Sequence, residues 1–495
     1  MSYIDVKNLS FCYDGSYDPV FEDVSFRIDT DWRCGLIGRN GRGKTTLLRL
    51  LCGAYDYSGQ IHASVEFDYF PYHVADPTAL TDAVLEELCP AAAPWQRSRE
   101  LSLLKVSDDV LYRPFETLSN GEQTKVLLAG LFLNEQRFLL IDEPTNHLDM
   151  EARTLVSDYL RQKSGFLLVS HDRAFLDRCV DHIFALNRNG MELQQGNFSS
   201  WFLNKQRQDA GELARNAQLK ADIRRLSEAA ARTKNWSDQV EKTKKGGRIA
   251  GLRPDRGAIG HKAAKLMKRA KAAEARKIQA AEEKAGLLKN IETAEPLSVH
   301  PLPYPKQRLA ELDGVAAAYA GTPAGTGVRF ALEKGDRIAL TGRNGCGKSS
   351  ILKLLAGEAV PHTGRLLTGS GLVVSYVPQN TGGLSGSLRA FIQARGIDES
   401  LCKAILRKLD FSRTQFEKDM AAYSAGQKKK VYLAASLCER AHLYLWDEPL
   451  NYIDVFSRMQ IEELLLTCQP TMLFVEHDRC FVDRLATQVI DLDMG

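Results

Sequence analysis

The pattern of apolar and polar positions divides the chain into two flanking parts and a middle part. Near the start, residues 4–11 and 20–28 alternate between apolar and polar side chains, as strands with one buried face do. Residues 33–37 are predicted to form a buried strand, and an apolar run at residues 138–143 ends in two carboxylates. Such runs are typical of parallel strands that are buried on both faces and emerge at their carboxyl edge. The flanking part is therefore predicted to be an α/β domain.

The middle of the chain follows a helical spacing. Apolar residues recur at intervals of three and four in two stretches, namely Leu219, Ile223, Leu226 and Ala230, then Ala263, Leu266, Ala270 and Ala273. These intervals are the seam of a two-helix coiled coil, and Gly and Pro residues between 246 and 260 separate them. The pattern predicts an α-helical coiled-coil hairpin with its tip near 248–260. Arms of about 35 to 45 residues would reach ~50 to 65 Å.

The two flanking parts repeat one another. Matching positions differ by 304 to 306 residues in the pairs Lys44 and Lys348, Ser119 and Ser424, Glu143 and Glu448, and His171 and His477. A tandem duplication is therefore predicted, with a first domain at 1–201, a hairpin linker at 202–300 and a second domain at 301–495.

Each copy contains a P-loop, Gly-x-x-x-x-Gly-Lys-Thr or Ser. Its glycines let backbone N–H groups curl around phosphates, its lysine reaches the β and γ phosphates, and its hydroxyl can ligate magnesium. The predicted ATP-binding residues are Gly38, Arg39, Asn40, Gly41, Arg42, Gly43, Lys44, Thr45 and Thr46, then Gly342, Arg343, Asn344, Gly345, Cys346, Gly347, Lys348, Ser349 and Ser350. Upstream, Tyr13 is placed to stack on adenine, although an aromatic residue near a strand end belongs to the core about as often.

A second motif follows each P-loop, and its serine comes 75 residues after Lys44 and 76 after Lys348. Leu118 to Gln123 and Tyr423 to Gln427 resemble the Leu-Ser-Gly-Gly-Gln signature of the ABC ATPases. The resemblance implies that the signatures close over ATP held by the opposite domain, through Ser119, Gly121 and Glu122 and through Ser424, Gly426 and Gln427. A capping box at a helix start is the simpler interpretation of the first motif, and both can hold.

In such an ATPase the carboxylates that end each strand have separate roles. Asp142 and Asp447 are expected to hold magnesium with Thr45, Ser349 and the Q-loop amide Gln379, while Glu143 and Glu448 polarise the attacking water. The resemblance places His171 and His477 at the γ-phosphate. The first copy departs from the pattern, because Phe70, Pro71 and Tyr72 stand where the Q-loop glutamine is expected.

The positive charge is concentrated in the linker. Residues 201–300 hold 23 Lys and Arg against 12 Asp and Glu, a net of +11, which leaves −8 for the rest of a chain whose net charge is +3. A basic stripe on the returning arm is typical of a phosphate-backbone partner such as RNA, although a solvated face on a spacer is the alternative. The predicted contacts are Arg248, Leu252, Arg253 and Pro254 at the tip and Lys262, Lys265, Lys268, Arg269 and Lys271 in the stripe.

Two ABC domains joined by a basic hairpin resemble the ABC-F family, and residues 448–454 and 475–478 resemble its Lsa/Vga-type antibiotic-resistance branch. This likeness implies an ATPase that requires ATP and Mg²⁺ and binds the E site of the bacterial ribosome, near large-subunit rRNA and P-site tRNA. Its linker would dislodge lincosamides, pleuromutilins and streptogramin A from the peptidyl transferase centre. A monomer that pairs its own two domains is expected.

Other classes remain open. A housekeeping ABC-F translation factor would carry the same motifs, and the ATPase of a drug exporter would carry the two domains. The absence of an apolar run of ~18 to 20 residues favours a cytoplasmic protein without a membrane partner. A chromosome or DNA-repair ATPase would insert its coiled coil within one domain, so DNA is not expected as a partner.

Overall fold

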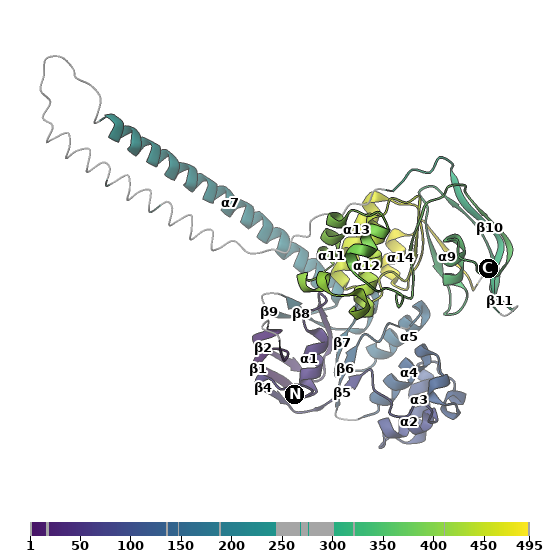
Figure 1. The fold of residues 1–495 in the computed structure, drawn as a ribbon. Coiled ribbons are helices and arrows are strands. Elements are labelled where there is room, and N and C mark those ends of the chain that lie inside the picture. The colour runs from purple at the N-terminus through teal and green to yellow at the C-terminus, as the bar shows by residue number, and fades with distance from the viewer. Residues whose placement is uncertain are drawn as a thin grey trace, which may run out of the picture. The chain divides into compact units, whose positions relative to one another are not determined.

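The computed structural model describes residues 2–15, 19–134, 137–146, 148–187, 190–243, 268, 276, 301–319, 322–409 and 411–493. The chain divides into two compact units, one made of Met1–Trp201 with Ala294–Gly495 and the other of Phe202–Thr293. The first unit contains both flanking domains, and each has an antiparallel sheet, a larger and mainly parallel sheet, and surrounding helices (Figure 1). The prediction of two tandem α/β domains is confirmed.

The first domain has a three-stranded sheet in the order β2-β1-β4 and a six-stranded sheet in the order β5-β6-β7-β3-β8-β9. The strands are β1 (Tyr3–Phe11), β2 (Phe21–Asp29), β3 (Arg33–Gly38), β4 (Ser58–Ala63), β5 (Glu66–Phe70), β6 (Arg137–Asp142), β7 (Phe166–Val169), β8 (His182–Asn187) and β9 (Gly190–Gln195). Strands β5, β6, β7, β3 and β8 run parallel. Their carboxyl ends therefore share one edge, which receives the P-loop after β3 and Glu143 after β6.

The helices of the first domain are α1 (Lys44–Leu51), α2 (Thr81–Leu88), α3 (Pro94–Leu103), α4 (Asn120–Leu131), α5 (Met150–Arg161) and α6 (Arg173–Cys179), with 3-10 turns η1 (Asp108–Tyr112) and η2 (Phe115–Thr117). Leu47 and Leu48 of α1 belong to one buried cluster with Ile4 of β1 and Leu36 of β3. Because this cluster joins both sheets to α1, it fixes the P-loop that leads into the helix.

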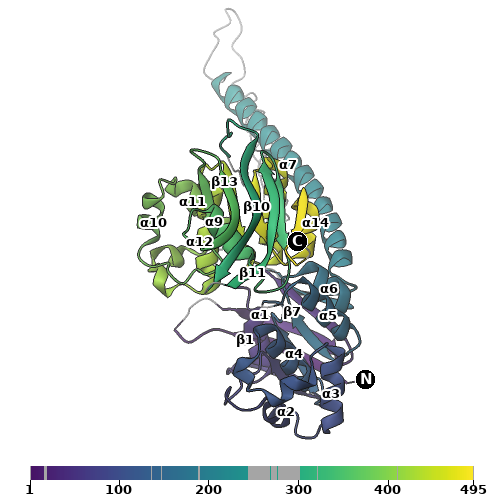
Figure 2. The ribbon, with the colours of Figure 1, turned by 90° about the vertical axis from the view of Figure 1, so that its right-hand side faces the viewer.

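The second domain repeats this plan with the sheets β11-β10-β13 and β14-β15-β16-β12-β17. Its strands are β10 (Arg308–Tyr319), β11 (Thr322–Glu333), β12 (Arg337–Thr341), β13 (His362–Thr368), β14 (Val374–Val377), β15 (Leu443–Asp447), β16 (Met472–Val475) and β17 (Gln488–Asp491). Its helices are α9 (Lys348–Leu355), α10 (Leu388–Ala394), α11 (Glu399–Lys408), α12 (Ala425–Cys438), α13 (Val455–Cys468) and α14 (Arg479–Leu485), with turns η3 (Arg413–Glu417) and η4 (Met420–Ala422). Figure 2 shows the long strands β10, β11 and β13 side by side.

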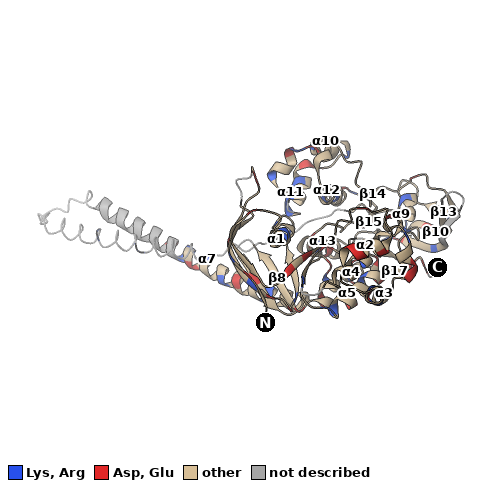
Figure 3. Ribbon diagram, turned by 90° about the horizontal axis from the view of Figure 1, so that it is seen from below, with Lys and Arg blue, Asp and Glu red and all other residues tan. Residues whose placement is uncertain are grey.

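The second unit is represented by helix α7 (Phe198–Thr243), whose 46 residues would extend about 69 Å at 1.5 Å each. Asn216, Leu219 and Ile223 are half-buried at the intervals of three and four expected for a coiled-coil seam, and Asp222 beside them is half-buried as well. The described surface of α7 mixes both signs of charge (Figure 3) and includes the ion pairs Lys205–Asp209 and Arg224–Glu228. No helix in the described parts of the chain is both long and apolar enough to cross a bilayer.

Most of the predicted returning arm and tip lies outside the described residues. Lys268 is helical and exposed, as is Arg276. The other predicted contacts, Arg248, Leu252, Arg253, Pro254, Lys262, Lys265, Arg269 and Lys271, fall in the undescribed ranges. The hairpin tip, the basic stripe and the three-part division of the chain therefore stay predictions.

Candidate active site

Both P-loops make the same turn into their helices. Gly43 and Gly347 precede α1 and α9 with φ of 89° and 99°, in the left-handed region that favours glycine. A Cβ atom at Gly43 would lie 2.6 Å from Cγ1 of Val20 and 2.8 Å from Cζ of Phe21. Space and backbone geometry together therefore require glycine here.

The P-loop lysines are folded under their own loops. Lys44 donates from Nζ to the carbonyl oxygen of Gly38 at 2.8 Å, and Lys348 donates to that of Gly342 at 2.7 Å. Both lysines are buried. Each loop thus combines an ammonium group with the N–H groups of a helix start, which is the chemistry of a phosphate site.

The predicted magnesium ligands lie together in each domain. The hydroxyl of Thr45 donates to Asp142 Oδ2 at 2.7 Å, and that of Ser349 donates to Asp447 Oδ1 at 3.1 Å. Asp447 is fully buried, and its Oδ2 has no hydrogen-bond partner among the described residues. Burial raises the pKa of Asp447 to about 6. A hydroxyl beside an unsatisfied carboxylate oxygen is a donor set that fits Mg²⁺.

The two glutamates adopt the same unusual backbone conformation. Glu143 and Glu448 have φ of 51° and 46°, which is costly for a residue with a side chain. Glu143 Oε1 lies 3.3 Å from His171 Nε2, and Glu448 Oε1 lies 3.5 Å from His477 Nε2. The strained turn thus aims each carboxylate at the histidine that sequence reasoning placed in the same site.

The two glutamates differ in their other partners. Gln379 donates to Glu448 Oε1 at 2.8 Å and Asn451 donates to Glu448 Oε2 at 2.6 Å. Burial acts to raise the pKa of Glu448, but hydrogen bonds from His477 and Gln379 outweigh it and lower this pKa to about 2.

In the first domain the balance is reversed. Burial, reinforced by the charge of Asp142, raises the pKa of Glu143 above its usual range. The first domain has no counterpart of Gln379, whose hydrogen bond helps to keep Glu448 ionised in the second domain. The two sites therefore differ electrostatically, although each contains a P-loop, a glutamate and a histidine.

Both signature serines cap helices. Ser119 accepts a hydrogen bond from the N–H of Glu122 at the start of α4, while Glu122 Oε2 accepts from the N–H of Ser119 at 2.9 Å. Ser424 and Gln427 form the same reciprocal pair at the start of α12. The capping-box interpretation of the first motif is thus confirmed, and the second motif has the same cap. Each cap leaves a helix start where an anion is favoured.

A cavity of about 740 Å³ brings the first signature together with the second P-loop. One side is formed by the first domain and the other by the second. Its lining includes Ser119, Gly121 and Glu122 from the first domain and Arg343, Asn344, Gly345, Gly347, Lys348, Ser349, Ser350, Gln379, Glu448 and His477 from the second. The two domains therefore meet head to tail around one nucleotide-sized space.

The first P-loop and the second signature also lie close to each other. Asn40 of the first P-loop donates to the carbonyl oxygen of Tyr452 at 2.8 Å. A Cβ atom at Gly426, in the second signature, would lie 3.0 Å from Cβ of Tyr452. Tyr452 thus links the first P-loop to the second signature.

Tyr13 lies beside the first P-loop helix. Its hydroxyl is 2.7 Å from Thr46 Oγ1, and its ring contacts Phe11 and Tyr55 edge-on. The ring is 42% exposed, so it combines an anchored hydroxyl with an accessible face. Adenine stacking stays a prediction.

Each domain also has an arginine, outside the motifs predicted from the sequence, that joins two loops of the site. Arg153 Nε donates to the carbonyl oxygen of Leu148 and its Nη1 to Asp172, the residue after His171. Arg458 makes the same two contacts, with Ile453 and Asp478. The signal was present, because the two arginines are 305 positions apart, the same offset as the two glutamates.

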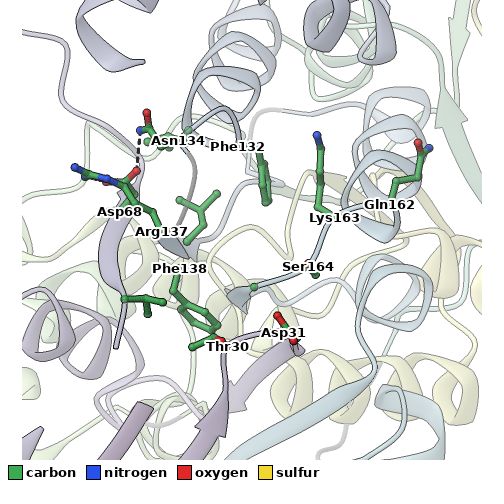
Figure 4. Close-up of a pocket in the computed structure, with 14 residues that line it drawn as sticks. Thr30, Asp31, Asp68, Phe132, Asn134, Arg137, Phe138, Gln162, Lys163 and Ser164 are labelled. Carbon is green, nitrogen blue, oxygen red and sulfur yellow. Dashed lines mark hydrogen bonds and ion pairs between the residues drawn. The ribbon is translucent and has the colours of Figure 1, made fainter. Parts of the chain in front are cut away.

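A second cavity, of about 390 Å³, lies in the first domain away from these motifs (Figure 4). Asp68 accepts from Asn134 and pairs with Arg137 on one side of it. Arg137 begins β6 and Gly165 precedes β7, so this cavity lies at the amino ends of the strands. It is therefore not part of the P-loop edge.

The motif geometry is matched by a comparison with protein families. A family model described as ABC transporter matches residues 21–146 and 326–451, more than half of the chain. The chain belongs to this family. It is an ATPase with two ABC domains, which bind and hydrolyse ATP.

Curated relatives of this ABC ATPase extend over nearly its whole length. The ATP-binding protein Uup of Caulobacter vibrioides is 29% identical over 96% of this chain and 75% of the relative. The ribosome protection protein VmlR of Bacillus subtilis is 27% identical over 97% and 85%. The energy-dependent translational throttle protein EttA of Haemophilus influenzae is 25% identical over 95% and 89%. With its tandem domains, the chain is an ABC-F family ATP-binding protein.

A solved structure supports the fold of this ABC ATPase. The crystal structure of a complex of the archaeal ribosomal stalk protein aP1 and the archaeal ribosome recycling factor aABCE1 contains a similar chain. The TM-score is 0.61 at 18% identity, over 94% of this chain and 84% of that chain.

Proposed function

We propose that this ABC-F ATPase binds the E site of the bacterial ribosome in its ATP-bound, closed form and uses its linker to dislodge antibiotics from the peptidyl transferase centre. The observation that carries the proposal is the cavity shared by the first signature and the second P-loop, in a chain whose domains are joined through a 46-residue helix. ATP bound between the two domains would hold them together, and the connecting helix would follow.

The residues of each site divide the work of hydrolysis. Lys44 and Lys348 hold the β and γ phosphates, while the signature serines contact the γ-phosphate from the opposite domain. Magnesium, held by Thr45 and Asp142 or by Ser349, Asp447 and Gln379, would neutralise phosphate charge. Glu143 and Glu448 accept the proton of the attacking water, and His171 and His477 orient the γ-phosphate.

The named relatives support two versions of this function. VmlR is called a ribosome protection protein, which favours resistance to lincosamides, pleuromutilins and streptogramin A. EttA is called a translational throttle, which favours a housekeeping role. The intervals of 75 and 76 residues between P-loop lysine and signature serine leave no room for a large insertion in the first domain. Because an insertion at this place is expected of housekeeping ABC-F factors, we favour the resistance branch.

The partners in this proposal are large-subunit rRNA and P-site tRNA. The chain acts in the cytoplasm as a monomer, because it supplies both halves of each ATP site. Neither DNA nor a membrane has a part in this mechanism.

Drug susceptibility tests the proposal directly. Cells that express the protein should tolerate lincosamides, pleuromutilins and streptogramin A better than cells without it, and the protein should sediment with ribosomes in ATP. Unchanged susceptibility with ribosome binding would favour the housekeeping role. Sedimentation with membranes instead would favour a drug exporter and contradict the proposal.

Alanine at Lys262, Lys265 and Lys268 should weaken the salt dependence of ribosome binding. Removing three phosphate contacts makes the slope of log affinity against log salt shallower by about 2 to 3 units. Co-sedimentation across a salt series measures this slope, and ATPase activity without ribosomes should be unchanged. The matched control is alanine at Lys220, Arg224 and Arg225, exposed on α7. An unchanged slope in the first variant would favour the solvated-spacer interpretation.

A further inference from the structure

A tyrosine occupies the same register position beside the magnesium-site aspartate in both domains. Tyr69 of β5 pairs with Leu140 of β6, so Asp142 lies two residues beyond its partner. Tyr376 of β14 pairs with Leu445 of β15, and Asp447 again lies two residues beyond. Because side chains alternate along a strand, tyrosine and aspartate share one face of each sheet. This diagonal separation is within reach of an aromatic side chain.

In the first domain the two side chains are bonded. The Tyr69 hydroxyl donates to Asp142 Oδ2 at 3.1 Å. The same oxygen accepts the hydroxyl of Thr45 at 2.7 Å. Two hydroxyls on one oxygen fix the carboxylate and leave Asp142 Oδ1 to face other groups.

In the second domain the tyrosine hydroxyl and one carboxylate oxygen are both buried, and no such bond joins them. The Ser349 hydroxyl donates a hydrogen bond to Asp447 Oδ1, and Asp447 Oδ2 has no hydrogen-bond partner among the residues described. The Tyr376 hydroxyl is likewise buried and unbonded within that part of the chain. Buried hydroxyls and carboxylate oxygens are nearly always paired in folded proteins. Tyr376 therefore has the donor that Asp447 lacks, on the same face and at the same register.

We propose that Tyr69 and Tyr376 are positioning residues that orient Asp142 and Asp447 for magnesium. This inference rests on the proposed magnesium site. Groups that hydrogen-bond a metal ligand restrict its rotation and set its basicity, so their loss weakens metal binding without removing a ligand. The first domain has this bond already, and the second forms it when Asp447 turns its free oxygen toward Tyr376.

The test is the Tyr69→Phe, Tyr376→Phe double variant of the full chain, which keeps both rings and removes only the hydroxyls. Binding of a fluorescent ATP analogue is titrated with Mg²⁺, so the readout is equilibrium binding and not turnover. The Mg²⁺ concentration at half-maximal binding should rise about tenfold. Binding in EDTA, without Mg²⁺, should stay as in the wild type.

Tyr159→Phe and Tyr444→Phe are the matched controls. Their buried hydroxyls donate to Glu100 Oε2 at 2.6 Å and to the carbonyl oxygen of Glu439 at 2.8 Å, outside the site. These controls should leave the Mg²⁺ midpoint unchanged. An unshifted midpoint in the double variant would overturn the proposal, as would equal weakening of binding in EDTA. If binding of the ATP analogue to the wild type did not depend on Mg²⁺, the proposed magnesium site itself would be wrong. The proposed ribosome function is tested by a separate measurement of ribosome binding.

Discussion

Replacing both Glu143 and Glu448 with glutamine should lower ATP hydrolysis by at least about a hundredfold, because a positioned general base contributes about 10² to 10⁴ in rate. Glutamine keeps the shape of the side chain but cannot accept the proton of water. Both glutamates lie on strained turns beside His171 or His477, away from the P-loop contacts of the two lysines. ATP binding should therefore persist while turnover stops. Phosphate release and nucleotide binding are measured on the same preparation.

In the proposed function the same variant should remain on ribosomes in ATP, because the closed form cannot reopen through hydrolysis. Co-sedimentation after a chase with excess unlabelled protein measures this retention. The matched control is Glu192→Gln with Glu463→Gln, at exposed positions outside the site. If the double variant of Glu143 and Glu448 left ribosomes as readily as the wild type, the link between ATP hydrolysis and release would be wrong.

The elements of the P-loop edge could be predicted from the sequence because their signals are local. The predicted strand at residues 33–37 is β3, and the predicted strand at residues 138–143 is β6, which ends at Asp142. The repeat offset also located each glutamate and histidine, and the structure brings each pair within 3.3 to 3.5 Å. These residues follow directly from strand ends and glycine turns, so spacing along the chain was sufficient.

Contacts that depend on pairing register could not be predicted in this way. At the first-domain position of the Q-loop glutamine the sequence has Phe70, Pro71 and Tyr72, and it predicts no magnesium-site residue there. The structure instead brings Tyr69 to Asp142, because β5 pairs in parallel with β6 and places Tyr69 on the same face. A shift of one residue in this pairing would move every side chain of β5 to the opposite face relative to β6, and no local sequence signal fixes the register.

Contacts that occur in only one of the two repeated domains are harder still to predict from the sequence. Glu462 of α13 is fully buried and accepts two hydrogen bonds from Arg173 of α6, at 3.0 and 3.1 Å. The repeat equivalent of Arg173 is Arg479, which pairs with the exposed Asp483 at 3.5 Å instead. The duplication therefore gave no hint of the buried pair, and neither residue belongs to a motif.

Glu462→Ala should lower the free energy of unfolding by about 3 to 5 kcal/mol, because it leaves the buried guanidinium of Arg173 without its partner. The Arg173 side chain is only 8% exposed, so water cannot replace the carboxylate. Arg484 also donates to Glu462 at 3.1 Å, but its side chain is 54% exposed and can return to solvent. Denaturant unfolding followed by tryptophan fluorescence measures the loss, as the apparent free energy of the first transition.

Two further variants separate charge from packing. Asp483→Ala breaks an exposed pair and should cost at most about 1 kcal/mol. Arg173→Met with Glu462→Leu removes both charges and keeps most of the volume, so it should be markedly more stable than Glu462→Ala alone. A double variant as unstable as Glu462→Ala would show that the unpaired charge of Arg173 does not determine the loss. If Glu462→Ala cost no more than Asp483→Ala, the buried pair would not stabilise the contact between α6 and α13.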